Sequence, residues 1–282
     1  MTLSFDPVVQ LTDTASVRWE TIGLAIVLFV GLLIAAWLRS ASPEQDLRLD
    51  DLAFMVVGAV PGAFLGGRLG YVLDHLDYYR ANPSAIADPA QGALTLTLAL
   101  PFGILTSSIV ARLIGAPIGR WMHAITLPLL FVLAAGKLVG VLGGSGQGAP
   151  FGGPGATAYI GPGPWGSLAA DVPSYPSQVY EAALVGLVMV VMAIMSLAPF
   201  IRRANGAALF VAVGLWSVAR FAVVATWRDV PAVGPLRMDQ ALLIGVLAVA
   251  VIGFVQRVRS RDVPARPATE PSVGVDAEAN PA

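Results

Sequence analysis

Long apolar stretches separated by shorter polar ones dominate the pattern along the chain. Each of these stretches is long enough to cross about 30 Å of hydrocarbon as a helix. The predicted spans are 20–38, 52–73, 92–114, 121–142, 178–199, 206–227 and 239–256. Pro101 interrupts the third span, but a membrane helix tolerates proline because neighbouring groups can bond the carbonyl that it frees. The pattern predicts an all-α integral membrane protein, a bundle of about seven transmembrane helices.

The composition agrees with a membrane location, since 56% of the 282 residues are hydrophobic and only 12% are charged. A soluble domain carries about 25% charged residues, whereas lipid tails solvate apolar side chains directly. Cysteine is absent, and the two histidines, His75 and His123, are too few for a metal cluster. The formal net charge of −1 provides no field for nucleic acid. We expect no metal and no nucleic-acid partner, and we assign no cofactor.

Basic residues are divided unevenly between alternate connections of the predicted bundle. One set, which includes the C-terminal tail, holds ten: Arg39, Arg48, Arg112, Arg120, Arg202, Arg203, Arg257, Arg259, Arg261 and Arg266. The other set holds four: Arg18, Arg80, Arg228 and Arg237. Because positive charge marks the cytoplasmic side, the N-terminus is predicted outside the cytoplasm and the C-terminus inside it. We expect the first span to be retained, because no small-residue cleavage site follows it.

Two polar regions complete the predicted organisation. The segment 143–177 contains no Lys or Arg and is rich in Gly and Pro, so we expect an external loop. The segment 261–282 is polar and rich in proline, so we expect a disordered cytoplasmic tail. The division is therefore a single transmembrane helical domain over 1–260, carrying the external loop, followed by the tail.

Arg68, Lys137 and Arg220 lie inside predicted spans rather than between them. A charged side chain at membrane depth is costly and usually faces a polar cavity, a partner or a substrate. Three such cations on separate helices indicate an anion-binding cavity, and a phospholipid headgroup is the anion that a membrane supplies. The alternative is that each cation reaches an interface or pairs with a carboxylate such as Glu181.

The fifth span begins with a dense polar patch, in which Gln178, Tyr180 and Glu181 follow Pro176 and Ser177. This is an ordinary helix start, where the helix dipole favours an acidic residue. It also places an amide, a phenol and a carboxylate beside the predicted external loop. Glu181 is therefore a candidate proton acceptor, or a group that holds a cation in place.

The glycine-rich stretch Gly143-Gly144-Ser145-Gly146 resembles the nucleophile motif of an intramembrane serine protease, but this function is excluded. Such an enzyme needs a histidine base on a later helix, and no histidine follows His123.

Several different short segments, spread over almost the whole chain, together form a pattern. They are Phe5-Asp6-Pro7-Val8, Phe64 to Leu73, Pro128-Leu129, Gly136-Lys137-Leu138, Pro176 to Glu181, Arg220-Phe221 and Met238-Asp239-Gln240. In this order and spacing they resemble the prolipoprotein diacylglyceryl transferase family. No single segment would be specific, but the colinear set is.

The resemblance implies a multi-pass enzyme of the bacterial inner membrane. Its members transfer diacylglyceryl from phosphatidylglycerol to the lipobox cysteine of preprolipoproteins, and glycerol phosphate is released. The nucleophile belongs to the substrate, so the absence of cysteine is compatible with this chemistry. By this resemblance Arg220, Lys137 and Glu181 are the candidate catalytic residues. The candidate headgroup-binding residues are Arg68, Lys137, Arg220, Gln178 and Tyr180, with phosphatidylglycerol or another anionic phospholipid and preprolipoprotein signal peptides as expected partners.

The chain departs from the family at several polar positions. The family signature Gly-Arg-x-Gly-Asn-Phe-x-Asn-x-Glu aligns with Gly136 to Ser145, where Lys137, Gly140, Gly143 and Ser145 replace arginine, both asparagines and glutamate. The family's His-Gly-Gly falls near Leu96-Thr97-Leu98, its Trp-Tyr-Gly aligns with Trp19-Glu20-Thr21, and a glutamate is replaced by Val224. Lysine keeps the charge of arginine but loses the bidentate fork that suits phosphate.

Two functions therefore stay open. The chain is either a diverged diacylglyceryl transferase or a non-catalytic relative that binds anionic lipid or assists assembly. A transporter or channel is the third hypothesis, and the duplicated half or paired broken helices expected of one are not evident.

Overall fold

The computed structural model describes residues 1–40, 47–88, 92–196 and 206–259, and within them seven helices are long and apolar enough to cross a membrane. They are α1 (Trp19–Ser40), α2 (Leu49–Asp74), α4 (Leu96–Leu113), α6 (Thr126–Gly143), α7 (Ser177–Met195), α9 (Ala207–Val224) and α10 (Met238–Arg259). Each overlaps one predicted span, and the ends differ by a few residues. The predicted all-α membrane bundle is confirmed.

The fourth predicted span, 121–142, differs most from the structure. Its first residues belong to a separate short helix, α5 (Ile118–Ala124), and α6 begins at Thr126. Pro128 favours the break, because a proline ring clashes with the carbonyl four residues earlier and fits best in the first turn of a helix, although Pro61 and Pro101 are accommodated inside α2 and α4. Apolar character alone does not distinguish one helix from two at this point.

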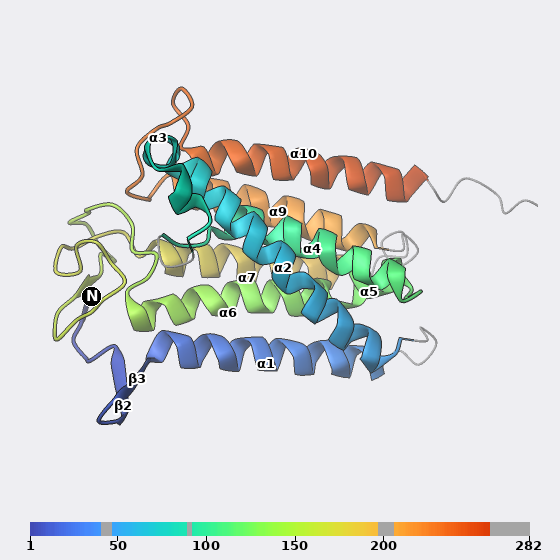
Figure 1. Cartoon of the computed structure of the whole chain (residues 1–282), viewed down its shortest axis with the longest axis horizontal. Coiled ribbons are helices and arrows are strands. Elements are labelled where there is room, and N and C mark those ends of the chain that lie inside the picture. Colours follow the sequence, from blue (N-terminus) through green and yellow to red (C-terminus); the bar gives the residue numbers. More distant parts are fainter. Residues whose placement is uncertain (41–46, 89–91, 197–205, 260–282) are drawn as a thin grey trace, which may run out of the picture.

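The helices follow each other around the bundle in an order unlike their order in the chain. α1 packs against α6, α6 against α7, α7 against α9 and α9 against α10, while α2 packs along α4 (Figure 1). α9 is the most buried of the seven helices. A residue on α9 can therefore meet side chains from several other helices.

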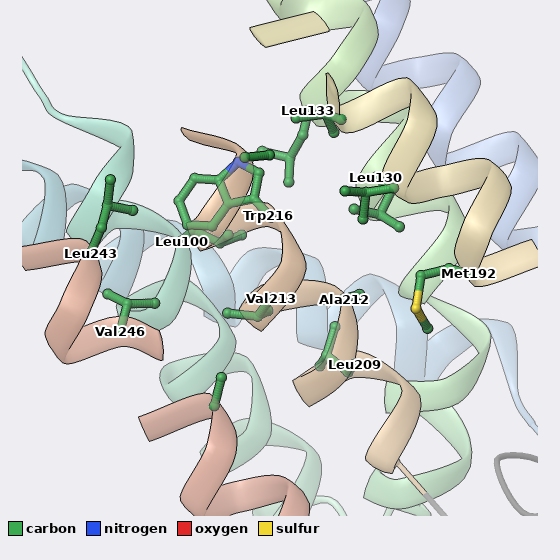
Figure 2. Packing of buried hydrophobic residues seen from close by; sticks show 14 of the residues in the cluster. Leu100, Leu130, Leu133, Met192, Leu209, Ala212, Val213, Trp216, Leu243 and Val246 are labelled. Carbon is green, nitrogen blue, oxygen red and sulfur yellow. The ribbon is translucent and has the colours of Figure 1, made fainter. Parts of the chain in front are cut away.

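The hydrophobic core lies where α4, α6, α7, α9 and α10 face one another. Figure 2 shows Trp216 and Val213 of α9 among leucine, valine and methionine side chains from the other helices. Members of this cluster with at most 1% of their surface exposed are Leu130, Val185, Met192, Leu209, Trp216, Val224 and Leu243. Packing of this kind holds membrane helices together, because lipid tails supply no hydrophobic driving force between them.

Glycines at every fourth position bring α2 and α4 into close contact. Gly58, Gly62, Gly66 and Gly70 lie on one face of α2, and a Cβ at Gly66 would overlap the carbonyl oxygen of Leu98 on α4. Small residues spaced by four allow two helix backbones to approach in this way. These glycines therefore determine which face of α2 packs against α4.

The predicted external loop is folded against the N-terminal segment. β4 (Ala158–Tyr159) of the loop pairs in parallel with β1 (Thr2–Leu3), and β2 (Val8–Thr12) and β3 (Ala15–Arg18) form a hairpin before α1. The guanidinium of Arg228, between α9 and α10, donates to the carbonyl of Gly148 at 2.6 Å. The loop thus contacts two other parts of the chain.

Where the structure describes them, the two sets of connections from the charge count lie at opposite ends of the bundle. The N-terminal segment, the α6–α7 loop, α3 (Leu76–Ala81), η2 (Pro83–Ile86) and the α9–α10 connection gather at one end (Figure 1). The end that faces the cytoplasm stays a prediction from charge, as does the division into domain, loop and tail. The predicted tail, 261–282, lies outside the described residues.

Candidate functional site

Four charged side chains from four helices form one ion-pair network inside the bundle. Glu181 Oε1 on α7 accepts from Arg220 Nη1 on α9 at 2.6 Å, and Glu181 Oε2 lies 2.9 Å from Lys137 Nζ on α6. Asp239 Oδ2 on α10 accepts from Arg220 Nη2 at 3.0 Å. The segments that carry these residues are far apart in the chain, so the network exists only in the folded bundle.

Arg220 is the centre of this network, and its side chain is only 3% exposed. Its Nε donates to Thr97 Oγ1 on α4 at 3.0 Å, so three different side chains receive hydrogen bonds from one guanidinium. The ring of Trp227 lies 4.6 Å from its Cζ, close enough for a cation–π contact. The guanidinium is therefore held on all sides by protein groups.

Lys137 is the most accessible member of the network. Its side chain is 23% exposed, against 1% for Glu181 and 5% for Asp239. The Trp227 ring lies 5.9 Å from its ammonium nitrogen. Lys137 is therefore the network member that the surrounding protein covers least.

The formal charges of the network cancel, because Lys137 and Arg220 carry two positive charges and Glu181 and Asp239 carry two negative ones. The pairing of cations with Glu181, which was the alternative to an anion-binding cavity, is the arrangement found. An excess of positive charge does not form here, because a buried cation is stable only when paired and hydrogen-bonded. Lys137 and Arg220 do meet, as predicted, but around one shared carboxylate, that of Glu181.

The structure does not bring Arg68 to this network, so the expected convergence of three cations is wrong for this residue. Its Nη2 donates to the carbonyl of Ala85 at 2.6 Å, and its Nε donates to that of Ile86 at 2.9 Å. The ring of Tyr79 lies 5.3 Å from its Cζ. Because α2 packs along α4, Arg68 meets the segment that follows α3, and it anchors that segment to the helix.

Gln178 and Tyr180, the other candidates on α7, lie in different surroundings. Gln178 is buried one turn before Glu181, and its Nε2 donates to the hydroxyl oxygen of Tyr159 at 2.8 Å. Its Oε1 is buried without a hydrogen-bond donor among the described residues. Tyr180 is half-buried and forms none of the ion pairs of the network. Burial raises the pKa of Tyr159 to about 12; the Gln178 hydrogen bond opposes this rise, and the charge of Glu20 adds to it.

A further carboxylate lies where the loop leaves α6. Glu20, in the first turn of α1, accepts a hydrogen bond from Ser145 Oγ at 2.7 Å through its Oε2. A Cβ at Gly143 would overlap this oxygen, so the missing side chain makes room for the carboxylate. Glu20 and Ser145 both stand at positions where the chain departs from the family pattern.

Sequence reasoning did not include Asp239 and Thr97 in the site. An acidic residue in the first turn of an apolar helix was a usable signal for Asp239, because the buried Arg220 requires a counter-charge. Thr97 has no comparable signal, since threonine in an apolar helix commonly bonds its own backbone. In the described part of the chain, no three His, Asp or Glu side chains are arranged to hold a metal ion.

The arrangement can bind and stabilise an anion that reaches Lys137, and it can hold the surrounding groups rigid. The glutamate and the aspartate of the network are both bound to Arg220, so neither carboxylate is free of a cation. Oxyanion stabilisation by a preorganised cation in a water-poor site is a large catalytic effect. The network is suited to holding a phosphate more than to removing a proton.

Comparison with known proteins gives one consistent result. A family model described as prolipoprotein diacylglyceryl transferase matches residues 7–256. Among curated relatives, a protein of Solidesulfovibrio magneticus is 30% identical over 281 residues, which cover 94% of this chain and 98% of that protein. One from Gluconacetobacter diazotrophicus is 28% identical over 96% of both chains, and one from Rhodospirillum centenum is 33% identical over 72% of both. Each is named phosphatidylglycerol–prolipoprotein diacylglyceryl transferase.

Proposed function

The chain belongs to the prolipoprotein diacylglyceryl transferase family, and on this premise we propose that it transfers diacylglyceryl from phosphatidylglycerol to the lipobox cysteine of preprolipoproteins. It is a multi-pass bacterial membrane protein. We place it in the inner membrane, with the α6–α7 loop outside the cytoplasm. The family match and the names of the relatives support the reaction, and the charge distribution supports the orientation.

The observation that carries the proposal is the ion-pair network with its accessible lysine. In the reaction, cleavage of a carbon–oxygen bond turns a phosphodiester into the phosphate monoester of glycerol, so negative charge grows on the phosphate. A cation fixed beside that phosphate stabilises the growing charge. We assign this contact to Lys137, because its side chain is the least buried of the four. We assign to Arg220 the positioning of Glu181, because its guanidinium is already engaged by Thr97, Glu181 and Asp239.

Gln178 provides a further reason to place a lipid headgroup at this site. Its Oε1 is a buried acceptor without a donor among the described residues, and it lies one helical turn from Glu181. A buried acceptor is costly when no hydrogen bond reaches it. The glycerol hydroxyl groups of phosphatidylglycerol are donors of the required kind. Arg68 is not included in this assignment, because its guanidinium donates to the carbonyls of Ala85 and Ile86.

The second candidate function is a non-catalytic relative that binds anionic phospholipid. It is favoured by one observation, namely that both carboxylates of the network are bound to cations and so provide no unpaired base. Both functions require phosphatidylglycerol to bind near Lys137. Only the transferase function also predicts that a lipoprotein becomes modified.

A genetic test separates the two functions. The chain is expressed in a bacterium depleted of its own transferase. Growth is measured in culture, and lipoprotein processing is followed by gel shift. We expect the wild-type chain to restore both, and Lys137→Ala to restore neither. Arg48→Ala, which alters an exposed arginine outside the bundle core, is the matched control and should behave as wild type.

Membrane insertion and retention of phosphatidylglycerol are measured on the same proteins, the latter by native mass spectrometry. A wild-type chain that inserts and retains phosphatidylglycerol but modifies no lipoprotein would establish the non-catalytic function. A chain that retains no anionic lipid would contradict both.

A further inference from the structure

The proposed reaction needs a group that takes the proton of the substrate thiol, because the thiolate is the nucleophilic form of cysteine. The network around Arg220 is a poor source of that group. Both oxygens of Glu181 face cations, and Lys137 and Arg220 can only donate hydrogen bonds. If Glu181 took a proton, it would give up its ion pairs with Lys137 and Arg220. Its new hydroxyl group would also face the N–H donors of these two cations.

Glu20 has a different neighbourhood. In the part of the chain that the structure describes, no Lys or Arg side chain forms an ion pair with it. Its carboxylate accepts from the hydroxyl of Ser145, and it is half-buried rather than enclosed. A serine hydroxyl both donates and accepts. Ser145 can therefore donate to the carboxylate and, after rotation, accept from the protonated acid, so Glu20 keeps a partner in both states.

The position of Glu20 suits an incoming protein substrate. It lies at the end of the bundle where the N-terminal segment and the α6–α7 loop gather (Figure 1). Gly143 beside it has no side chain, and a Cβ there would lie 2.9 Å from the carboxyl carbon. The carboxylate thus occupies space that only glycine leaves open, at the place where the loop departs from α6.

The place of Glu20 relative to the proposed phosphate contact follows from α6. Gly143, which Glu20 adjoins, is six residues after Lys137, which corresponds to roughly 9 Å along the helix axis and about 120° around it. Glu20 therefore lies nearer the α6–α7 loop than Lys137 does, and a thiol that enters from the loop end meets Glu20 first.

We propose that Glu20, hydrogen-bonded to Ser145 in the space beside Gly143, is the proton acceptor for the substrate thiol. This assignment rests on the proposed function. The thiol proton passes to the Glu20 carboxylate, and the sulfur electron pair forms the carbon–sulfur bond to the glyceryl carbon. The carbon–oxygen bond to phosphate breaks, and its electron pair leaves with glycerol phosphate. Glu20 then releases its proton to solvent or to the departing phosphate, so no oxidant or other reactant is needed.

A purely structural role is the competing explanation, in which Glu20 only holds the loop through Ser145. The two roles predict different effects of three substitutions. Glu20→Gln keeps an oxygen that accepts from Ser145 but cannot take a proton. Ser145→Ala keeps the carboxylate but removes the hydrogen bond. Glu20→Asp keeps a carboxylate on a shorter side chain.

The test uses purified full-length protein in vesicles containing phosphatidylglycerol, with a lipobox peptide as acceptor. For Glu20→Gln we expect a fall in kcat of about 100-fold or more, the size of a lost general base, with KM for phosphatidylglycerol unchanged. Ser145→Ala should lose less than Glu20→Gln, and Glu20→Asp should regain part of the rate. Asp77→Asn, an exposed carboxylate on α3, is the matched control for loss of an acid.

Each outcome decides the matter. Equal losses for Glu20→Gln and Ser145→Ala, or a lower melting temperature for Glu20→Gln that accounts for its loss, would establish the structural role and overturn the proposal. A Glu20→Gln variant with wild-type kcat would overturn it as well, while leaving the proposed function intact. A wild-type chain that modifies no peptide would overturn the proposed function, and the role of Glu20 with it.

Discussion

Arg220 donates to side chains on three other helices, so one guanidinium links α4, α7 and α10 to α9. Each partner is nearly inaccessible, and the network contains as many carboxylates as cations. Such a network adds little net stability compared with apolar packing, but the loss of one member leaves an uncompensated buried charge. The residue is therefore a sensitive point of the fold, whatever its part in the reaction.

Replacing Arg220 by alanine should destabilise the bundle strongly. Glu181 would keep one cation and Asp239 would keep none, so we expect the free energy of unfolding to fall by ~3–5 kcal/mol. The measurement is unfolding of the purified protein in lipid bicelles. Arg48→Ala, whose partner Asp50 is equally exposed, should change the free energy by less than ~1 kcal/mol. Similar values for the two variants would show that the network does not stabilise the fold.

At the scale of elements, α2 and α4 lie in close contact because glycines on α2 leave room for the α4 backbone. Gly58, Gly62, Gly66 and Gly70 repeat at four-residue intervals and face α4. Close approach of two backbones replaces the hydrophobic effect that would drive helix association in water. This contact also decides where Arg68 goes, since it fixes the rotation of α2 about its own axis.

A single methyl group on this face should be enough to disturb it. In Gly66→Ala the new Cβ would overlap the backbone carbonyl of Leu98, which cannot move as a flexible side chain can. We expect a loss of ~1–3 kcal/mol in the free energy of unfolding, typical of overpacking. Unfolding in lipid bicelles measures this loss.

Gly186→Ala is the matched control for this substitution. Gly186 lies on α7, and a Cβ added there would meet no heavy atom within 4 Å, so the variant should equal or exceed wild type in stability. Equal stabilities for the two alanine variants would show that α2 and α4 do not depend on this contact.

At the scale of the whole molecule, the bundle has two different ends. One carries the N-terminal hairpin, the α6–α7 loop and the α9–α10 connection, and α5 and the basic last turns of α1 and α10 lie at the other (Figure 1). Glu20 belongs to the first end, so the proposed acceptor site opens on the side assigned to the cell exterior. The orientation therefore decides whether an exported substrate can reach it.

The orientation can be measured directly because the chain has no cysteine. A single cysteine at Thr14, in the turn between β2 and β3, should react with a membrane-impermeant maleimide in intact spheroplasts. A single cysteine at Arg48, before α2, should react only after the membrane is permeabilised. The reverse pattern would place the N-terminus in the cytoplasm and contradict the proposed route of the substrate.

The sequence by itself determined the seven spans, the family and three of the four network residues, Lys137, Glu181 and Arg220. Span length and apolar character are properties of contiguous residues, and the cost of charge in lipid marks a buried arginine wherever the fold places it. The split of 121–142 into two helices is a local exception, caused by Pro128.

Only the tertiary structure decided which polar and charged side chains meet. Arg220 and Thr97 are 123 residues apart, and Glu20 and Ser145 are 125 apart. Arg68, equally marked by its place in an apolar span, was directed elsewhere by the rotation of α2 on α4. The physical reason is that a helix forms from its own backbone bonds, whereas an ion pair needs two helix faces brought together by packing along their whole length.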